Sequence, residues 1–202
     1  TDCPEPEEPE TTEFSCGDPV NYHGYDYATL QIGEQCWFAE NLRSVSYQNG
    51  DSIPTNLNDE DWSIVNYGAC SFYVGPDWFE ADTLLYQSIG MLYNRYVIED
   101  IRNVCPSGWH VSTDSDWMVI ELELGMPLEE LEQFGNRGVV EGIGQIMRAS
   151  ESDSPSWNGT NESGLGLLPG LGRRANGSWV HPGIDEGYFW TSDIPMIGRR
   201  KV

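Results

Sequence analysis

Cysteines are the side chains with the clearest chemistry in this sequence. The chain has five, and they form neither a C-x-x-C pair nor a Cys/His cluster with metal-ligand spacing, which favours disulfides over a zinc site. Cys16 and Cys36 flank the first predicted hairpin, and a disulfide between them would close a loop of about twenty residues and contribute roughly 3 kcal/mol. Cys3 lies in an acidic tail and is a candidate for an intermolecular disulfide. Because disulfides persist in oxidising compartments, we expect a secreted, extracellular or cell-surface protein.

Carboxylates in two loop-like stretches form a pattern that suits a metal ion. Asp59 and Asp61 lie in the first stretch, and Asp77 and Asp82 lie in the second. Hard oxygen ligands in loops are what calcium takes, although the D-x-[DN]-x-[DN]-G spacing of an EF-hand is absent. Calcium is therefore the one candidate cofactor, and the alternative is that these carboxylates belong to a solvated surface.

The overall charge restricts the partners. Asp and Glu number 33 against 10 Lys and Arg, which gives a formal charge of -23. Such a chain repels phosphate backbones and anionic lipid heads, so we expect no nucleic-acid partner. No apolar run reaches 18 residues, so we expect no direct membrane insertion. The sequence begins at Thr1 without a signal segment, and we expect either a removed signal peptide or a fragment.

Motifs for covalent catalysis are missing. The sequence contains no H-E-x-x-H, G-x-S-x-G or S-x-x-K, and the glycine-rich stretch 164–172 lacks the Lys-Ser/Thr of a phosphate-binding loop. We therefore predict a non-enzymatic protein. A glycosidase pair formed by distant carboxylates is the alternative that sequence leaves open.

The eight tryptophans divide by context. Four lie inside strand or helix patterns, where core packing is the expected role: Trp37, Trp109, Trp117 and Trp190. Four lie in loop-like contexts, where an exposed ring could contact a ligand: Trp62, Trp78, Trp157 and Trp179. His110 follows a tryptophan in a predicted strand and is expected to be a buried, hydrogen-bonded imidazole.

Three N-x-S/T sequons crowd the glycine-rich last third of the chain, at Asn158, Asn161 and Asn176. Such sequons can accept glycans where they lie in accessible loops. Glycosylation at these three positions is a prediction, and the alternative is a chance match to a short motif.

The first half of the chain predicts a tail, a hairpin and a loop. Residues 1–13 hold three prolines and six acidic residues without a large apolar side chain, which indicates an extended tail or linker. Residues 25–32 and 35–38 are rich in β-formers on either side of Gly33-Glu34, which predicts a β-hairpin. Residues 44–62 contain turn formers without helical periodicity and predict a long surface loop.

The second half predicts helices followed by short strands. Apolar spacing indicates a helix over 82–100, and Thr113 with Asp116 indicates a capped helix that ends at Gly125. A short strand entered through a turn is expected over 105–111, and a short helix is expected after Pro127, over 128–134. Residues 138–202 predict short strands joined by long loops. The outcome is one α+β domain over 14–202 with two or three helices.

Five sequence blocks resemble a known family, the Fibrobacter succinogenes major paralogous domain of Bacteroidetes and Fibrobacter surface proteins. They are QCWFAENL at 35–42, LYQSIGMLYNRYVIED at 85–100, CPSGWHVSTDSDW at 105–117, WNGTNESGLGLLPGLGRR at 157–174 and GYFWTSD at 187–193. The resemblance covers about residues 14 to 200. It implies a secreted, C-type-lectin-like mixed fold, and it carries over no catalytic residues.

The resemblance also implies a difference near the end of the chain. Members of the family continue beyond the last aromatic block into a closing strand with a cysteine, which this sequence lacks, and Cys105 is the residue expected to pair with that cysteine. An exposed sheet edge accepts a strand from another chain, so we expect the missing strand to be supplied by a neighbouring copy or the sequence to be truncated.

Two functional hypotheses follow. The first is a structural or adhesive surface module that assembles with copies of itself into a homo-oligomer or fibre. The second is a carbohydrate-binding, lectin-like module that takes glycans with the help of calcium, although the Glu-Pro-Asn and Trp-Asn-Asp signatures of calcium-dependent lectins are missing.

Overall fold

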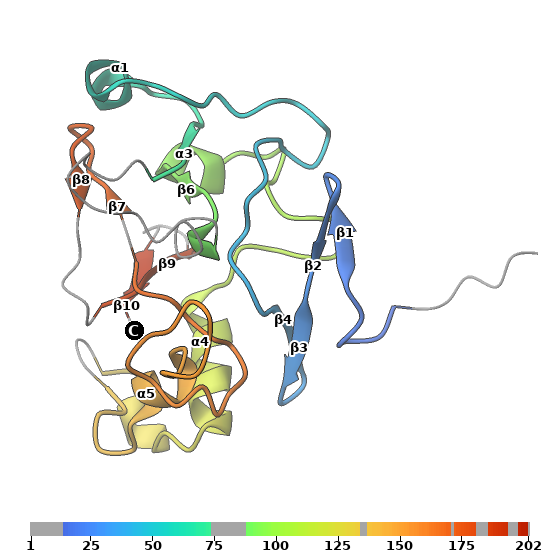
Figure 1. Cartoon of the computed structure of the whole chain (residues 1–202), viewed down its shortest axis with the longest axis vertical. Helices are drawn as coiled ribbons and strands as arrows, with labels where there is room; N and C mark the ends of the chain where they lie inside the picture. The colour runs from blue at the N-terminus through green and yellow to red at the C-terminus, as the bar shows by residue number, and fades with distance from the viewer. Residues whose placement is uncertain are drawn as a thin grey trace, which may run out of the picture.

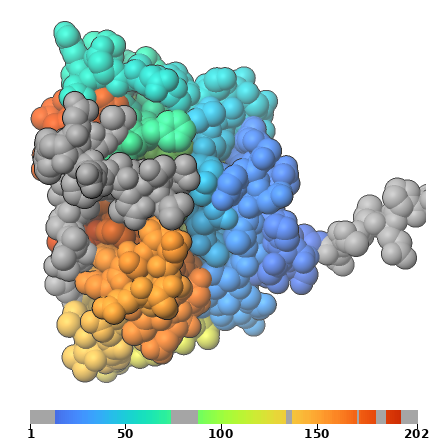
Figure 2. Space-filling model, in the orientation of Figure 1, coloured from blue at the N-terminus to red at the C-terminus, as the bar shows by residue number. Residues whose placement is uncertain are grey.

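The computed structural model describes residues 14–73, 88–133, 137–170, 172–180, 186–193 and 198–201. Its elements are short helices and five two-stranded antiparallel sheets, which confirms the α+β prediction, although the described residues hold four α-helices where two or three were predicted. The N-terminal hairpins lie along one side of the molecule, and helices α4 and α5 lie at one end (Figures 1 and 2). The predicted tail at 1–13 lies outside the described residues.

Two consecutive hairpins form the N-terminal side. Strand β1 (Val20–Tyr22) pairs with β2 (Tyr25–Tyr27), and β3 (Thr29–Ile32) pairs with β4 (Gln35–Phe38) in the predicted register around Gly33. A disulfide joins Cys16 to Cys36 with a Cα–Cα distance of 5.8 Å, as predicted. It ties the chain before β1 to the middle of β4.

The middle of the chain differs from expectation. Within the predicted loop 44–62, helix α1 (Asp59–Ile64) begins after an Asn58 cap. The predicted helix over 82–100 is wrong for its described part, which contains strand β6 (Leu92–Tyr93) and helix α3 (Arg95–Ile98); residues 82–87 lie outside the described residues. Gly90 is the physical reason, because its φ of +74° is left-handed and ends any helix there. Strand β6 pairs instead with β5 (Cys70–Ser71).

Helix α4 (Asp114–Glu123) confirms the prediction from its cap. The Thr113 side chain accepts from the Asp116 N–H and the Asp116 carboxylate accepts from the Thr113 N–H, which is a capping box. The helix predicted after Pro127 is a 3-10 turn, η1 (Leu128–Glu130). Of the prediction for 105–111, the entry turn is confirmed, with the Trp109 N–H donating to the Pro106 carbonyl at 3.0 Å, but the strand is wrong because the segment after the turn has no strand pairing.

The last third contains one helix that sequence reasoning missed, α5 (Ile143–Met147). The predicted short strands are present as two pairs, β7 (Gly172–Arg173) with β8 (Trp179–Val180) and β9 (Tyr188–Thr191) with β10 (Gly198–Lys201). Among the helices of the described residues, none combines the length and apolar composition needed to span a bilayer.

The described residues form three apolar clusters, and the two larger ones hold most of these elements together. The first joins α4 and α5 to the N-terminal hairpins through Trp117, Ile120 and Ile143. Trp117 is buried as expected, and the predicted core residue Trp37 packs on it with 5.2 Å between ring centroids. The second cluster includes Cys70 and Cys105. Residues of both clusters also line a cleft.

Candidate functional site

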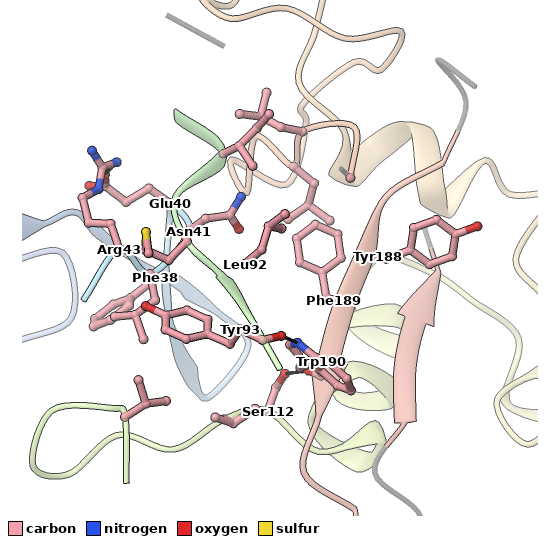
Figure 3. A pocket seen from close by; sticks show the side chains of 18 of the residues that line it. Phe38, Glu40, Asn41, Arg43, Leu92, Tyr93, Ser112, Tyr188, Phe189 and Trp190 are labelled. Carbon is pink, nitrogen blue, oxygen red and sulfur yellow. Dashed lines mark hydrogen bonds and ion pairs between the residues drawn. The ribbon is translucent and has the colours of Figure 1, made fainter. Parts of the chain in front are cut away.

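A cleft of about 1670 Å³ opens between the N-terminal hairpins and the C-terminal half of the chain. Strand β6 lies between the segment that follows β4 and strand β9 (Figure 3). The Met91 N–H donates to the Leu42 carbonyl at 3.0 Å, and the Trp190 indole donates to the Tyr93 carbonyl at 3.0 Å. These hydrogen bonds hold the segment after β4 and strand β9 on either side of β6, although the three segments are far apart in sequence. The segment after β4 is called the cleft wall below.

An ion pair stiffens the wall that follows β4. The Arg43 guanidinium lies 3.0 Å from Glu40 and 4.0 Å over the centre of the Tyr25 ring. The Tyr25 hydroxyl donates to the same carboxylate at 2.5 Å, and this hydrogen bond raises the pKa of Tyr25. The other Glu40 oxygen accepts from the Ala28 N–H at 3.0 Å. Glu40 therefore links the wall to Tyr25 on β2 and to the backbone at Ala28, and it pairs with one guanidinium nitrogen of Arg43.

A second cluster of polar side chains in the cleft lies at the start of α4, around Asp116. Asp116 accepts from the N–H and the hydroxyl of Thr113, both at 2.7 Å, and lies 3.0 Å from His110 Nε2. Burial opposes ionisation of Asp116, but the hydrogen bonds from Thr113 and His110 outweigh it and lower its pKa. The expectation of a buried His110 is wrong, because 68% of its side chain is exposed.

The two free thiols beside the cleft are buried and unreactive. Cys70 and Cys105 are buried free cysteines in one apolar cluster. Burial raises the pKa of each to about 12, so both are protonated near neutral pH. Neither has the character of a nucleophile.

The four tryptophans predicted to contact a ligand are not gathered in one place. Trp62 and Trp157 are only 6% and 7% exposed, so the expectation of exposed rings is wrong for both. Trp179 is half-buried, with its ring edge-on to Tyr73 at a centroid distance of 5.1 Å. Trp78 lies outside the described residues.

The Trp62 indole is buried because the Arg173 side chain covers its ring. Its guanidinium lies 4.4 Å from the centre of the Trp62 ring and 5.0 Å from that of Trp179. The same group pairs with Asp59 at 2.9 Å, and the Trp62 indole donates to the Arg174 carbonyl at 3.1 Å. Three residues predicted to bind ligand or metal are thus assembled around one arginine in a structural role.

The predicted metal ligands are placed only in part. Asp59 pairs with Arg173, and Asp61 accepts from the Asn58 amide at 2.8 Å, while Asp77 and Asp82 lie outside the described residues. Over the described ranges, no group of three or more His, Cys, Asp or Glu side chains is arranged to hold a metal ion. Calcium binding stays a prediction, which melting curves in millimolar calcium and in chelator would test.

The three sequons have different surroundings. Asn158 and Asn176 are exposed. Asn161 is half-buried with a left-handed φ of +54°, its amide donates to Asp153 at 3.0 Å and its carbonyl accepts from Gly166 at 2.8 Å. Exposure therefore favours Asn158 and Asn176 over Asn161 as glycan acceptors.

Sequence reasoning missed most residues that line the cleft, among them Asn41, Leu92 and Phe189, whereas Trp62, a predicted ligand contact, does line it. The available signal was the run of polar residues directly after β4, within the block 35–42. A strand end is where side chains commonly leave the core and become available to a ligand. Its partners on β6 and β9 carry no such signal.

Comparison with known proteins identifies one relationship. The family model described as the Fibrobacter succinogenes major domain matches residues 30–196. Comparison with curated proteins and with solved structures gives no match.

Proposed function

The chain belongs to the Fibrobacter succinogenes major domain family, and from that premise we propose that it is a secreted or cell-surface adhesive module that binds a carbohydrate chain in its central cleft. The observation that carries the proposal is the composition of the cleft. Aromatic side chains such as Trp37, Phe189 and Trp190 line it together with hydrogen-bonding groups. Apolar sugar faces and hydroxyl groups require that combination. The disulfide supports an extracellular location.

We propose that the module is non-enzymatic because its cleft carboxylates are already engaged. Hydrogen bonds from Ser150 lower the pKa of Asp153, and those from Thr113 help to lower that of Asp116. A glycosidase needs one carboxyl group with a raised pKa as its general acid. Two carboxylates with lowered pKa values are poor candidates for that role. We also propose the finer, C-type-lectin-like arrangement for this mixture of short strand pairs, helices and long loops.

A glycan array probed with the full chain tests the proposal, followed by titration with any glycan that is retained. Leu92→Trp places a large ring in the cleft and should weaken binding at least tenfold. Val140→Trp adds the same ring to a turn outside the cleft, where residue 140 is 90% exposed, and should leave the affinity unchanged. Retention of no glycan, or equal effects of the two variants, would contradict the proposal.

Self-assembly is the second candidate function. Among the described strands, β10 pairs only with β9, so its other edge has backbone groups that a strand from another copy could use. Light scattering and electron microscopy test this candidate. Fibres or higher oligomers would support it, and monodisperse monomers at high concentration would contradict it.

A further inference from the structure

Asn41 differs from its charged neighbours in the cleft wall. Its side-chain amide points into the cleft (Figure 3), and it has no hydrogen-bond partner among the residues that the structure describes. Glu40, directly before it, and Arg43, two residues after it, pair with each other at 3.0 Å. An asparagine amide offers two donor hydrogens and an acceptor oxygen, so Asn41 presents unused donors and an unused acceptor to a ligand.

The backbone holds this amide in a fixed position. The Leu42 carbonyl accepts from the Met91 N–H at 3.0 Å, and the Arg43 N–H donates to the Tyr27 hydroxyl at 3.1 Å. Gly90 packs so closely that an added Cβ would lie 2.7 Å from the Leu42 carbonyl oxygen and 3.0 Å from the Asn41 Cβ. Because the surrounding chain is packed, binding at Asn41 needs little ordering of the protein.

Apolar side chains lie beside the amide. Leu92 on β6 and Phe189 on β9 face the same space (Figure 3). Phe189 is supported from behind by Trp117, with 5.6 Å between the ring centroids. The site therefore joins a donor and acceptor pair to a small apolar surface.

We propose that this subsite recognises the acetamido group of an N-acetylated sugar. The N–H of an acetamido group can donate to the Asn41 side-chain oxygen, and its carbonyl can accept from the Asn41 side-chain NH₂. Its methyl group can pack on Leu92 and Phe189. The ligand is neutral, which suits a chain with a formal charge of -23. This inference rests on the proposed function, because it names the sugar class for the same cleft.

The test compares two oligosaccharides of equal length, chitooligosaccharide and cello-oligosaccharide, which differ in the acetamido group at C2. Titration of the full chain should show a preference of about tenfold for the N-acetylated oligomer, as expected for one or two hydrogen bonds. Asn41→Leu keeps the size of the side chain and should remove the preference. Asn66→Leu, at an exposed position outside the cleft, should retain it.

The outcomes separate the two proposals. Equal binding of both oligomers would overturn the acetamido inference while the carbohydrate proposal stands, and binding of neither would overturn both. Stronger binding of an acetylated glycine peptide would also overturn both, in favour of a polypeptide ligand. Asn41→Leu should keep the wild-type melting temperature. If it unfolds, Asn41→Asp, which keeps the shape and removes the donors, should show the same loss of preference.

Discussion

Replacement of Arg173 by alanine should destabilise the protein by about 2 to 4 kcal/mol, because its buried guanidinium serves several partners at once. The side chain is 3% exposed and donates to the Leu57 carbonyl at 2.8 Å and to the Gly177 carbonyl at 3.1 Å. Each carbonyl would lose a charged donor, and the rings of Trp62 and Trp179 would lose a cation–π contact worth about 0.5 to 2 kcal/mol.

The ion pair with Asp59 should contribute little to this total. Asp59 is 64% exposed, and pairs with an exposed partner contribute about 0 to 1 kcal/mol. Asp59→Asn is therefore the matched control, expected to cost less than 1 kcal/mol. Urea unfolding measures both variants, and the alanine variant should also melt roughly 5 to 15 °C lower. An alanine variant within 1 kcal/mol of wild type, or an equal cost for Asp59→Asn, would refute the reasoning.

Three further predictions concern the disulfide, pH and glycosylation. Replacement of Cys16 and Cys36 by serine should lower the unfolding free energy by about 3 kcal/mol, measured by urea titration, since the bond closes a separation of 20 residues; a loss below 1 kcal/mol would contradict it. Hydrogen bonds from Arg102 lower the pKa of Asp100 to about 2, so its stabilisation is complete above the unfolded pKa near 3.9 and is lost as the pH falls towards 2. Asp100→Asn should therefore reduce the slope of unfolding free energy against pH between about pH 2 and 4. An unchanged slope would argue against the interaction of Asp100 with Arg102. Expression in a glycosylating host should leave Asn161 unmodified in peptide mapping, and a glycan found there would show that its hydrogen bonds with Asp153 and Gly166 are not maintained.

Features set by neighbours in sequence could be predicted. The cap of α4 depends on Thr113 and Asp116, three residues apart, and the hairpin of β3 and β4 depends on a turn at Gly33. The Cys16–Cys36 disulfide could be predicted because its two cysteines are only 20 residues apart, on either side of the first strands. In each case the partner is close in the chain, so spacing carries the information.

Features set by distant partners could not be predicted. The apolar spacing around Leu92 fits a helix, but strand pairing with Cys70 and the left-handed Gly90 decide the outcome. Trp62 lies in a loop-like context, yet Arg173, more than a hundred residues away, covers its ring. The cleft joins Asn41, β6 and β9 in the same way, and no local spacing encodes that meeting.

The central claim is that a carbohydrate binds in the cleft, and NMR of the tryptophan indole N–H groups during titration with an array-selected glycan tests it most directly. Trp37 and Trp190 line the cleft, whereas Trp157 and Trp179 lie outside its lining. The account predicts that the indole signals of Trp37 and Trp190 shift with glycan concentration while those of Trp157 and Trp179 stay in place. Shifts confined to Trp157 and Trp179, or no shift at all at saturating glycan, would contradict it.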